Sequence, residues 1–124
     1  MNPEKIIGEL DKAKAELSRI LPQICETLFK LQQEGTTEQG RKMLRDDCDK
    51  VQAYGRSIGT LIDLSIDHVQ EKRMDLFEDD LEKMESWQKD VKHYKLHDAF
   101  WSICKNISSV VSTVIKIRYS SDNQ

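Results

Sequence analysis

Residues that interrupt a helix are scarce in this sequence, since its 124 residues include only 5 Gly and 2 Pro. A sheet protein of this size would need many more turn residues and more β-branched side chains. The apolar fraction is also low, at 38%, whereas the charged fraction of 33% exceeds the roughly 25% typical of globular proteins. Few breakers, many charges and a modest apolar content together predict long helices that each carry one apolar stripe.

Cysteines are few and widely separated. Cys25, Cys48 and Cys104 form no CxxC pair, and their odd number and wide spacing predict reduced thiols in a cytosolic protein. Because they lie in or beside apolar stripes, we expect all three to be small core side chains. No stretch approaches the roughly 20 apolar residues of a membrane span, and the charged start of the chain is unlike a secretory signal. We therefore expect a cytoplasmic protein.

The charged residues form no concentrated basic surface. The formal net charge is −3, and Lys and Arg are interspersed with Asp and Glu along most of the chain. Nucleic acid binding needs a basic face, because the phosphate backbone is recognised through its charge. Binding to a strongly anionic membrane surface also needs a cluster of basic side chains. The charge balance therefore argues against nucleic acid, and against such a membrane as the main partner.

The first apolar stripe predicts one long helix. It repeats in steps of three and four residues and consists of Ile6, Leu10, Ala13, Leu17, Ile20, Ile24, Leu28 and Leu31. Asn2 is expected to cap this helix and Gly35 to end it. Pro22 lies inside the stripe, but the apolar phase continues through it, which predicts one kinked helix rather than two.

A second helix is expected to begin near Thr36, which with Gln39 forms a capping-box pattern. Its apolar positions are Met43, Leu44, Cys48, Val51, Tyr54, Ile58, Leu61, Ile62, Leu64, Ile66 and Val69. Gly55 and Gly59 lie within it, and folding back on the first helix would place them level with Ala13 and Ala15. Small residues that face small residues would let the two helices approach closely.

The third segment carries two apolar stripes that do not share one helical phase. The first is Leu76, Phe77, Leu81, Met84, Trp87, Val91 and Tyr94. The second is Leu96, Phe100, Ile103, Ile107, Val110, Val114 and Ile117. No Gly or Pro marks a break, although Asp98 could cap a new helix. The segment is therefore either one long kinked helix over 75–119 or two helices that meet near 95–98.

These patterns predict an all-α fold, an antiparallel bundle of three long helices, with a four-helix arrangement as the close alternative. Residues 1–119 are expected to form a single helical-bundle domain. Residues 120–124 are expected to form a frayed C-terminal tail.

Residues that could catalyse a reaction or bind a metal lack the partners that such sites need. His93 and His97 would share one face of a helix, but no HExxH or CxxC motif supplies further zinc ligands. The carboxylates over 46–49 and 78–85 have neither the alternating ligands nor the glycine turn of a calcium loop. Phosphate-binding glycine motifs are absent. We therefore expect no enzyme activity, no metal site and no cofactor, with both histidines on the surface.

The outer side of the helix over 105–118 differs from that of every other predicted helix, because it is nearly uncharged. It carries Ser108, Ser109, Ser112 and Thr113, edged by Lys105 and Lys116. Small uncharged side chains are poor choices for a free helix surface but good ones where another helix lies close. Trp101 follows Phe100, so one of the two must lie away from the apolar side, and an exposed Trp could anchor a partner.

Two interpretations of this face remain open. The last helix could be the most buried one of a four-helix arrangement, or the face could receive a partner. In the second case the partner-binding residues would be Trp101, Lys105, Ser108, Ser109, Ser112 and Lys116. The leading hypothesis is a non-catalytic protein–protein interaction module, a small helical adaptor that binds a helix of another protein or a second copy of itself. The alternative is a membrane-active bundle whose C-terminal helix lies in a lipid interface.

Overall fold

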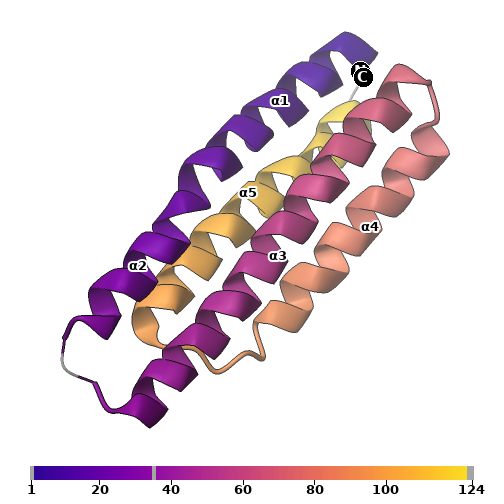
Figure 1. The fold of residues 1–124 in the computed structure, drawn as a ribbon. Helices are drawn as coiled ribbons and strands as arrows, with labels where there is room; N and C mark the ends of the chain where they lie inside the picture. The colour runs from indigo at the N-terminus through magenta and orange to yellow at the C-terminus, as the bar shows by residue number, and fades with distance from the viewer. Residues whose placement is uncertain (1, 35, 123–124) are drawn as a thin grey trace.

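The computed structural model describes the backbone of residues 2–34 and 36–122, which is helical apart from short connections. The helices of this part are α1 (Pro3–Ile20), α2 (Pro22–Gln32), α3 (Glu38–Gln70), α4 (Met74–Val91) and α5 (Asp98–Asp122). α1 and α2 form one bent helix, and successive long helices run in opposite directions, so that α1 begins at the end of the bundle where α5 finishes (Figure 1). The predicted all-α antiparallel bundle is confirmed.

The bend between α1 and α2 lies at Pro22. A proline has no backbone N–H, and its ring crowds the carbonyl one turn earlier, which interrupts a regular helix. Leu21 still has helical backbone angles, with φ −55° and ψ −43°, and its N–H donates to the Leu17 carbonyl at 3.0 Å. Burial continues across the bend from Ile20 to Ile24. The prediction of one kinked helix is confirmed.

The third apolar segment forms two helices. α4 ends at Val91, α5 begins at Asp98, and residues 92–97 connect them. The four-helix alternative is therefore right, and a single helix over 75–119 is wrong. The change of apolar phase is the cause, because one straight helix would have exposed one of the two stripes. The backbone of α5 is helical to Asp122, into the predicted tail, whose last two residues lie outside the described part of the chain.

Side-chain caps fix the starts of α1 and α3. Asn2 caps α1 as predicted, because its Oδ1 accepts from the Lys5 N–H at 3.2 Å. Thr37, rather than Thr36, caps α3, since the Thr37 Oγ1 accepts from the Gly40 N–H at 3.0 Å. The helix therefore begins near the capping-box pattern, as predicted, with the cap one residue after Thr36. Two adjacent threonines offer the same side chain, and only the backbone geometry selects between them.

The apolar stripes of the helices meet in one core. α1 and α4 each pack against both α3 and α5, and α2 packs against α3 and α5. Fully burying a large aliphatic or aromatic side chain contributes roughly 1.5–3 kcal/mol, so this core is the main source of stability. The largest fully buried side chains are Phe100, Ile6, Leu10, Leu17, Ile24, Ile58, Ile62, Leu81, Met84, Ile107, Val51 and Val69.

Gly55 lets α3 approach the bent helix closely. A Cβ added at Gly55 would overlap the Leu21 Cδ2, and one at Gly59 would lie 3.4 Å from the Leu17 Cδ2. The glycines therefore face leucines, and the predicted pairing with two alanines of α1 is wrong. At Gly55 the Leu21 side chain occupies the space that the missing Cβ leaves, in the manner of a knob in a hole.

Candidate functional site

The outer face of α5 is open to solvent. Over residues 102–119 its exposed side chains recur every three or four residues and are Ser102, Lys105, Asn106, Ser109, Thr113, Lys116 and Tyr119. Two of these seven are charged. With Asp98 at the start of the helix, three of the eight exposed side chains of α5 are charged, whereas six of the eight exposed side chains of α4 are charged. No acidic residue occurs between Asp98 and Asp122, so both charges among the seven are positive. The face is therefore small, polar and weakly basic, which is unusual for a helix surface that meets only water.

Lys105 and Lys116 lie on one line along this face. Eleven residues are close to three full turns, so the two lysines are about 16 Å apart along the helix axis. Among the ion pairs between described residues none includes either lysine. By contrast, Arg118 on the same helix is half-buried and contacts Glu78 and Glu85 of α4. The two exposed lysines thus remain available for carboxylates of another molecule.

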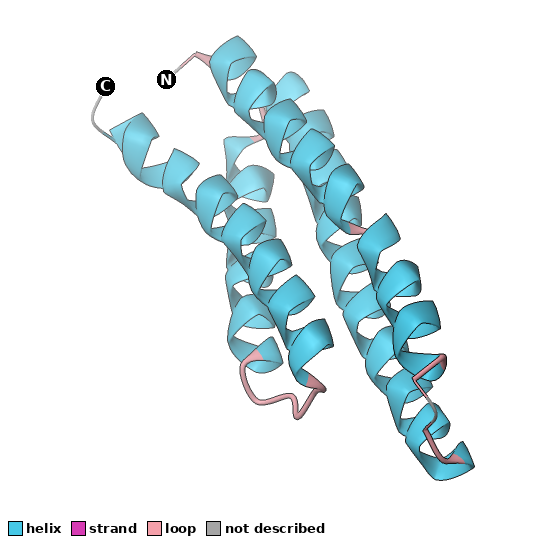
Figure 2. Ribbon diagram, turned by 90° about the vertical axis from the view of Figure 1, so that its left-hand side faces the viewer, coloured by secondary structure: helices cyan, strands magenta, loops and turns pink. Residues whose placement is uncertain are grey.

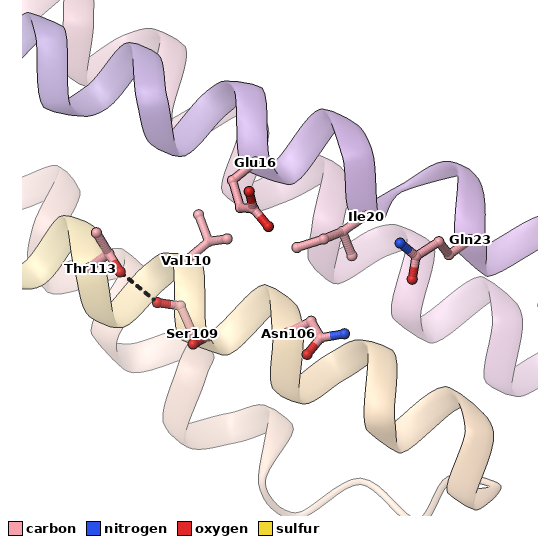
Figure 3. A pocket seen from close by; sticks show the side chains of 7 residues that line it. All are labelled: Glu16, Ile20, Gln23, Asn106, Ser109, Val110 and Thr113. Carbon is pink, nitrogen blue, oxygen red and sulfur yellow. Dashed lines mark hydrogen bonds between the residues drawn. The ribbon is translucent and has the colours of Figure 1, made fainter.

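A shallow groove separates this face from the bent helix. It has a volume of about 320 Å³ (Figure 3) and is lined by Glu16, Ile20, Gln23, Asn106, Ser109, Val110 and Thr113. Ile20 and Val110 are buried and form its apolar floor. The Thr113 hydroxyl donates to the Ser109 carbonyl at 3.1 Å, so its hydrogen-bonding need is met within the helix. Glu16 pairs with Arg19, which offsets the one charge in the lining.

Ser108 and Ser112 lie on the other edge of the face and bond within the bundle. The hydroxyls of Tyr54 and Ser108 are 2.8 Å apart. The Gln88 amide donates to the Ser112 Oγ at 2.7 Å and to the Ser108 carbonyl at 2.9 Å. Burial raises the pKa of Tyr54 to about 12, against the opposing effect of its hydrogen bond to Ser108. These two serines are thus partly buried and contact α3 and α4.

The predicted partner-binding set is thus divided by the structure. Lys105, Ser109 and Lys116 are exposed together on the outer face. Trp101 is partly buried against the core instead of standing in water as an anchor. A periodic pattern identifies one face of a helix, but it does not say which edge meets a neighbour. That distinction required the positions of α1 and α4.

The two histidines considered as metal ligands do not share a helix. His93 and His97 lie in the connection between α4 and α5. His97 caps α5 in place of Asp98, because its Nδ1 accepts from the Ala99 N–H at 3.1 Å. Its own N–H donates to the Asp47 Oδ2 at 2.9 Å, which ties the loop to α3. Within residues 2–34 and 36–122, no group of three His, Cys, Asp or Glu side chains is arranged to hold a metal ion.

A buried polar cluster joins α3 to α4 and was missed from the sequence. The Oδ2 of Asp80, which is 3% exposed, lies 2.6 Å from the His68 Nδ1 and 3.3 Å from the Ser65 Oγ. In a catalytic triad the imidazole stands between the serine and the carboxylate. Here both side chains contact the carboxylate, so this arrangement activates no nucleophile. The sequence did contain a sign of this cluster, because Asp80 occupies a position on the apolar stripe, three residues after Phe77.

α2 and α3 extend past the α4–α5 connection (Figure 2). A second hollow is lined by residues of these two helices and of the connection. Its volume is about 480 Å³, and its lining includes Leu31, Leu44 and Leu96. Met43 stands at its rim and is 61% exposed, although the sequence placed it in an apolar stripe; Phe29 on α2 is 65% exposed. Acidic and basic side chains both line the hollow, so charge selects no partner for it.

The chain matches no protein-family model, and no curated protein or solved structure is significantly similar to it. Across the described ranges, no helix combines the length and the apolar character needed to cross a bilayer. The feature that sets this bundle apart is the outer face of α5, an exposed helix surface with small side chains and charges of one sign.

Proposed function

We propose that this protein is a non-catalytic protein–protein interaction module, a small cytoplasmic adaptor or regulator that binds a partner helix on the outer face of α5. The observation that supports the proposal most strongly is the low charge of this exposed face, with two charged side chains of seven. A helix that meets only water gains solubility from charges, and α4 has them.

The shape of the face suits a helix. The distance between packed helix axes, commonly 8–10 Å, depends on the side chains at the contact, and small ones permit the shorter values. Ser109 and Thr113 are small, and the groove beside them has an apolar floor of Ile20 and Val110. A helix seated between α1 and α5 would bury that floor and meet no bulky side chain along Asn106, Ser109 and Thr113.

The charges of the face favour an acidic partner. Lys105 and Lys116 would meet carboxylates about 16 Å apart, which two residues eleven positions apart on a partner helix provide. Exposed ion pairs contribute only about 0.2–1 kcal/mol each, so they set the orientation and the choice of partner more than the affinity. A second copy of this chain fits less well, because a symmetric dimer would bring lysines of the same sign to one interface.

The membrane-active alternative requires a larger rearrangement. The apolar side of α5, including Phe100, Ile107 and Val114, is fully buried in the core. Lying in a lipid interface would require α5 to leave the bundle and expose the apolar sides of α1, α3 and α4. We therefore favour the interaction module.

Capture of partners from a cell extract with a charge-reversed face tests the proposal. The test variant is Lys105→Glu/Lys116→Glu, and the matched control is Lys42→Glu/Lys83→Glu, which makes the same charge change at exposed positions of α3 and α4. We expect wild type and control to retain the same partner and the test variant to lose it at least tenfold. The partner's protected segment should be an acidic helix. Equal capture by all three proteins, with unchanged helicity, would contradict the proposal, and anionic vesicles captured instead would favour the membrane alternative.

A further inference from the structure

Two cysteines of different helices lie side by side. Cys25 on α2 is exposed, whereas Cys48 on α3 is 3% exposed. Gln52 stands one turn after Cys48 on the same face of α3, and its side-chain amide donates to the Cys25 sulfur at 2.9 Å. The Cys25 side chain therefore lies over the face of α3 that carries Cys48. The expectation that all three cysteines are core side chains is wrong for Cys25.

The surroundings of Cys48 reflect the same neighbour. Burial raises the pKa of the Cys48 thiol to about 11, and the charge and hydrogen bonding of Cys25, together with the charge of Asp49, add to the rise. Cys104 differs, because burial alone raises its pKa to about 11. The contact of Gln52 with the Cys25 sulfur and the effect of Cys25 on Cys48 together place these two thiols close to each other, and Cys104 provides an internal control.

We propose that Cys25 and Cys48 form a reversible disulfide that joins α2 to α3, with a low-molecular-weight disulfide such as oxidised glutathione as the oxidant. Exposure sets the order of the steps. The Cys25 thiolate attacks one sulfur of the small disulfide, forms a mixed disulfide and expels one small thiolate. Cys48 loses its proton to solvent and attacks the Cys25 sulfur, which expels the second small thiolate. Two protein thiols are oxidised by two electrons, and one small disulfide is reduced to two thiols.

The bond would lie just after the bend at Pro22. It would hold α2 against α3 and close a loop of about 23 residues, which removes conformational freedom mainly from the unfolded chain. Gln23, two residues before Cys25, lines the groove beside α5, so the bond would also fix that end of the groove. The inference concerns α2 and α3 alone and stands apart from the proposed binding function.

Intact-mass analysis of the folded, full-length protein treated with oxidised glutathione tests this inference. We expect wild type to become about 2 Da lighter, with no glutathione retained and a peptide link between Cys25 and Cys48. Cys104→Ser should behave identically, and Cys48→Ala should stop one glutathione heavier. Cys25→Ser should not react while it stays folded, because both remaining thiols are buried. The oxidised wild type should melt roughly 5–10 °C above the reduced form.

Three results would overturn the inference. The first is a wild type that stops at the mixed disulfide, as Cys48→Ala does. The second is a recovered link that includes Cys104. The third is a folded wild type that remains fully reduced under the conditions that modify Cys48→Ala. Circular dichroism recorded before the treatment establishes that each variant is folded. If Cys48→Ala does not fold, Cys48→Val takes its place in the same comparison.

Discussion

Substitution of the glycines by alanine separates close helix contact from simple helix propensity. Replacing Gly by Ala in a helix interior stabilises it by about 1 kcal/mol when the new Cβ meets nothing. Gly8 of α1 has no atom within 4 Å of the added Cβ, so Gly8→Ala should gain this amount and raise Tm by roughly 4 °C. The Cβ at Gly59 would lie 3.4 Å from the Leu17 Cδ2, so Gly59→Ala should gain nearly as much.

Gly55→Ala should behave in the opposite way. Its Cβ would overlap the Leu21 Cδ2, whereas the Ile107 Cδ1 at 3.4 Å would be in ordinary contact, so the crowding comes from Leu21. Overpacking of this kind costs about 1–3 kcal/mol, which exceeds the gain in propensity and leaves a net loss of about 1 kcal/mol. Urea unfolding followed by circular dichroism measures each free energy of unfolding.

A double-mutant cycle with Leu21→Ala tests the cause of that loss. In the Leu21→Ala background the overlapping methyl group is gone, and Gly55→Ala should become stabilising, which gives a coupling of about 1–2 kcal/mol. If Gly55→Ala stabilised the intact protein as much as Gly8→Ala, or if the coupling were absent, the close approach of α3 to the bend would be refuted.

Two further predictions concern buried polar and titratable groups. Asp80→Ala should lower the free energy of unfolding by about 1–3 kcal/mol, because the partly buried His68 imidazole loses its partner while Ser65 keeps the Leu61 carbonyl. Asp79→Ala at the exposed neighbour should change it by less than about 0.5 kcal/mol, and equal effects would contradict the cluster. Burial raises the pKa of Cys48 and Cys104 to about 11 and of Tyr54 to about 12. The folded state holds these protons more tightly than the unfolded state. The contribution of each protonated group to the free energy of unfolding is therefore complete below about pH 9. It falls by about 1–3 kcal/mol per group as the pH rises toward 12. Tyr54→Phe should make urea unfolding less sensitive to pH above 10, and an unchanged sensitivity would contradict this origin.

The fold could be predicted because its signals are local. The stripe from Ile6 to Leu31 keeps its phase across Pro22, which indicated one bent helix, and the shift between Tyr94 and Leu96 indicated the break before α5. The adjacent Thr36 and Thr37 gave the region of the helix start correctly, but the sequence could not select which of them is the cap. The helix periodicity also says nothing about the register between helices, so the contact of Gly55 with Leu21 was not predictable.

The candidate site could be predicted only as a face. The small residues of α5 were visible in the sequence, but which of them meet α4 depends on how the helix is rotated within the bundle. Ser108 and Ser112 turned out to bond with Tyr54 and Gln88, whereas Ser109 remained exposed. The meeting of His68 with Asp80 and of Cys25 with Cys48 likewise joins residues far apart in the sequence. Their side-chain types suggested neither pairing, because each depends on the packing of two helices.

Photo-crosslinking from position 109 tests most directly whether the outer face of α5 is the working surface. A photoreactive residue replaces Ser109 in one protein and Ser86, an exposed serine of α4, in the matched control. We expect one partner to be crosslinked from position 109 and not from position 86, through a peptide that belongs to an acidic helix. Crosslinking of the same partner from position 86 alone, or equally from both positions, would contradict the assignment of the binding face to α5.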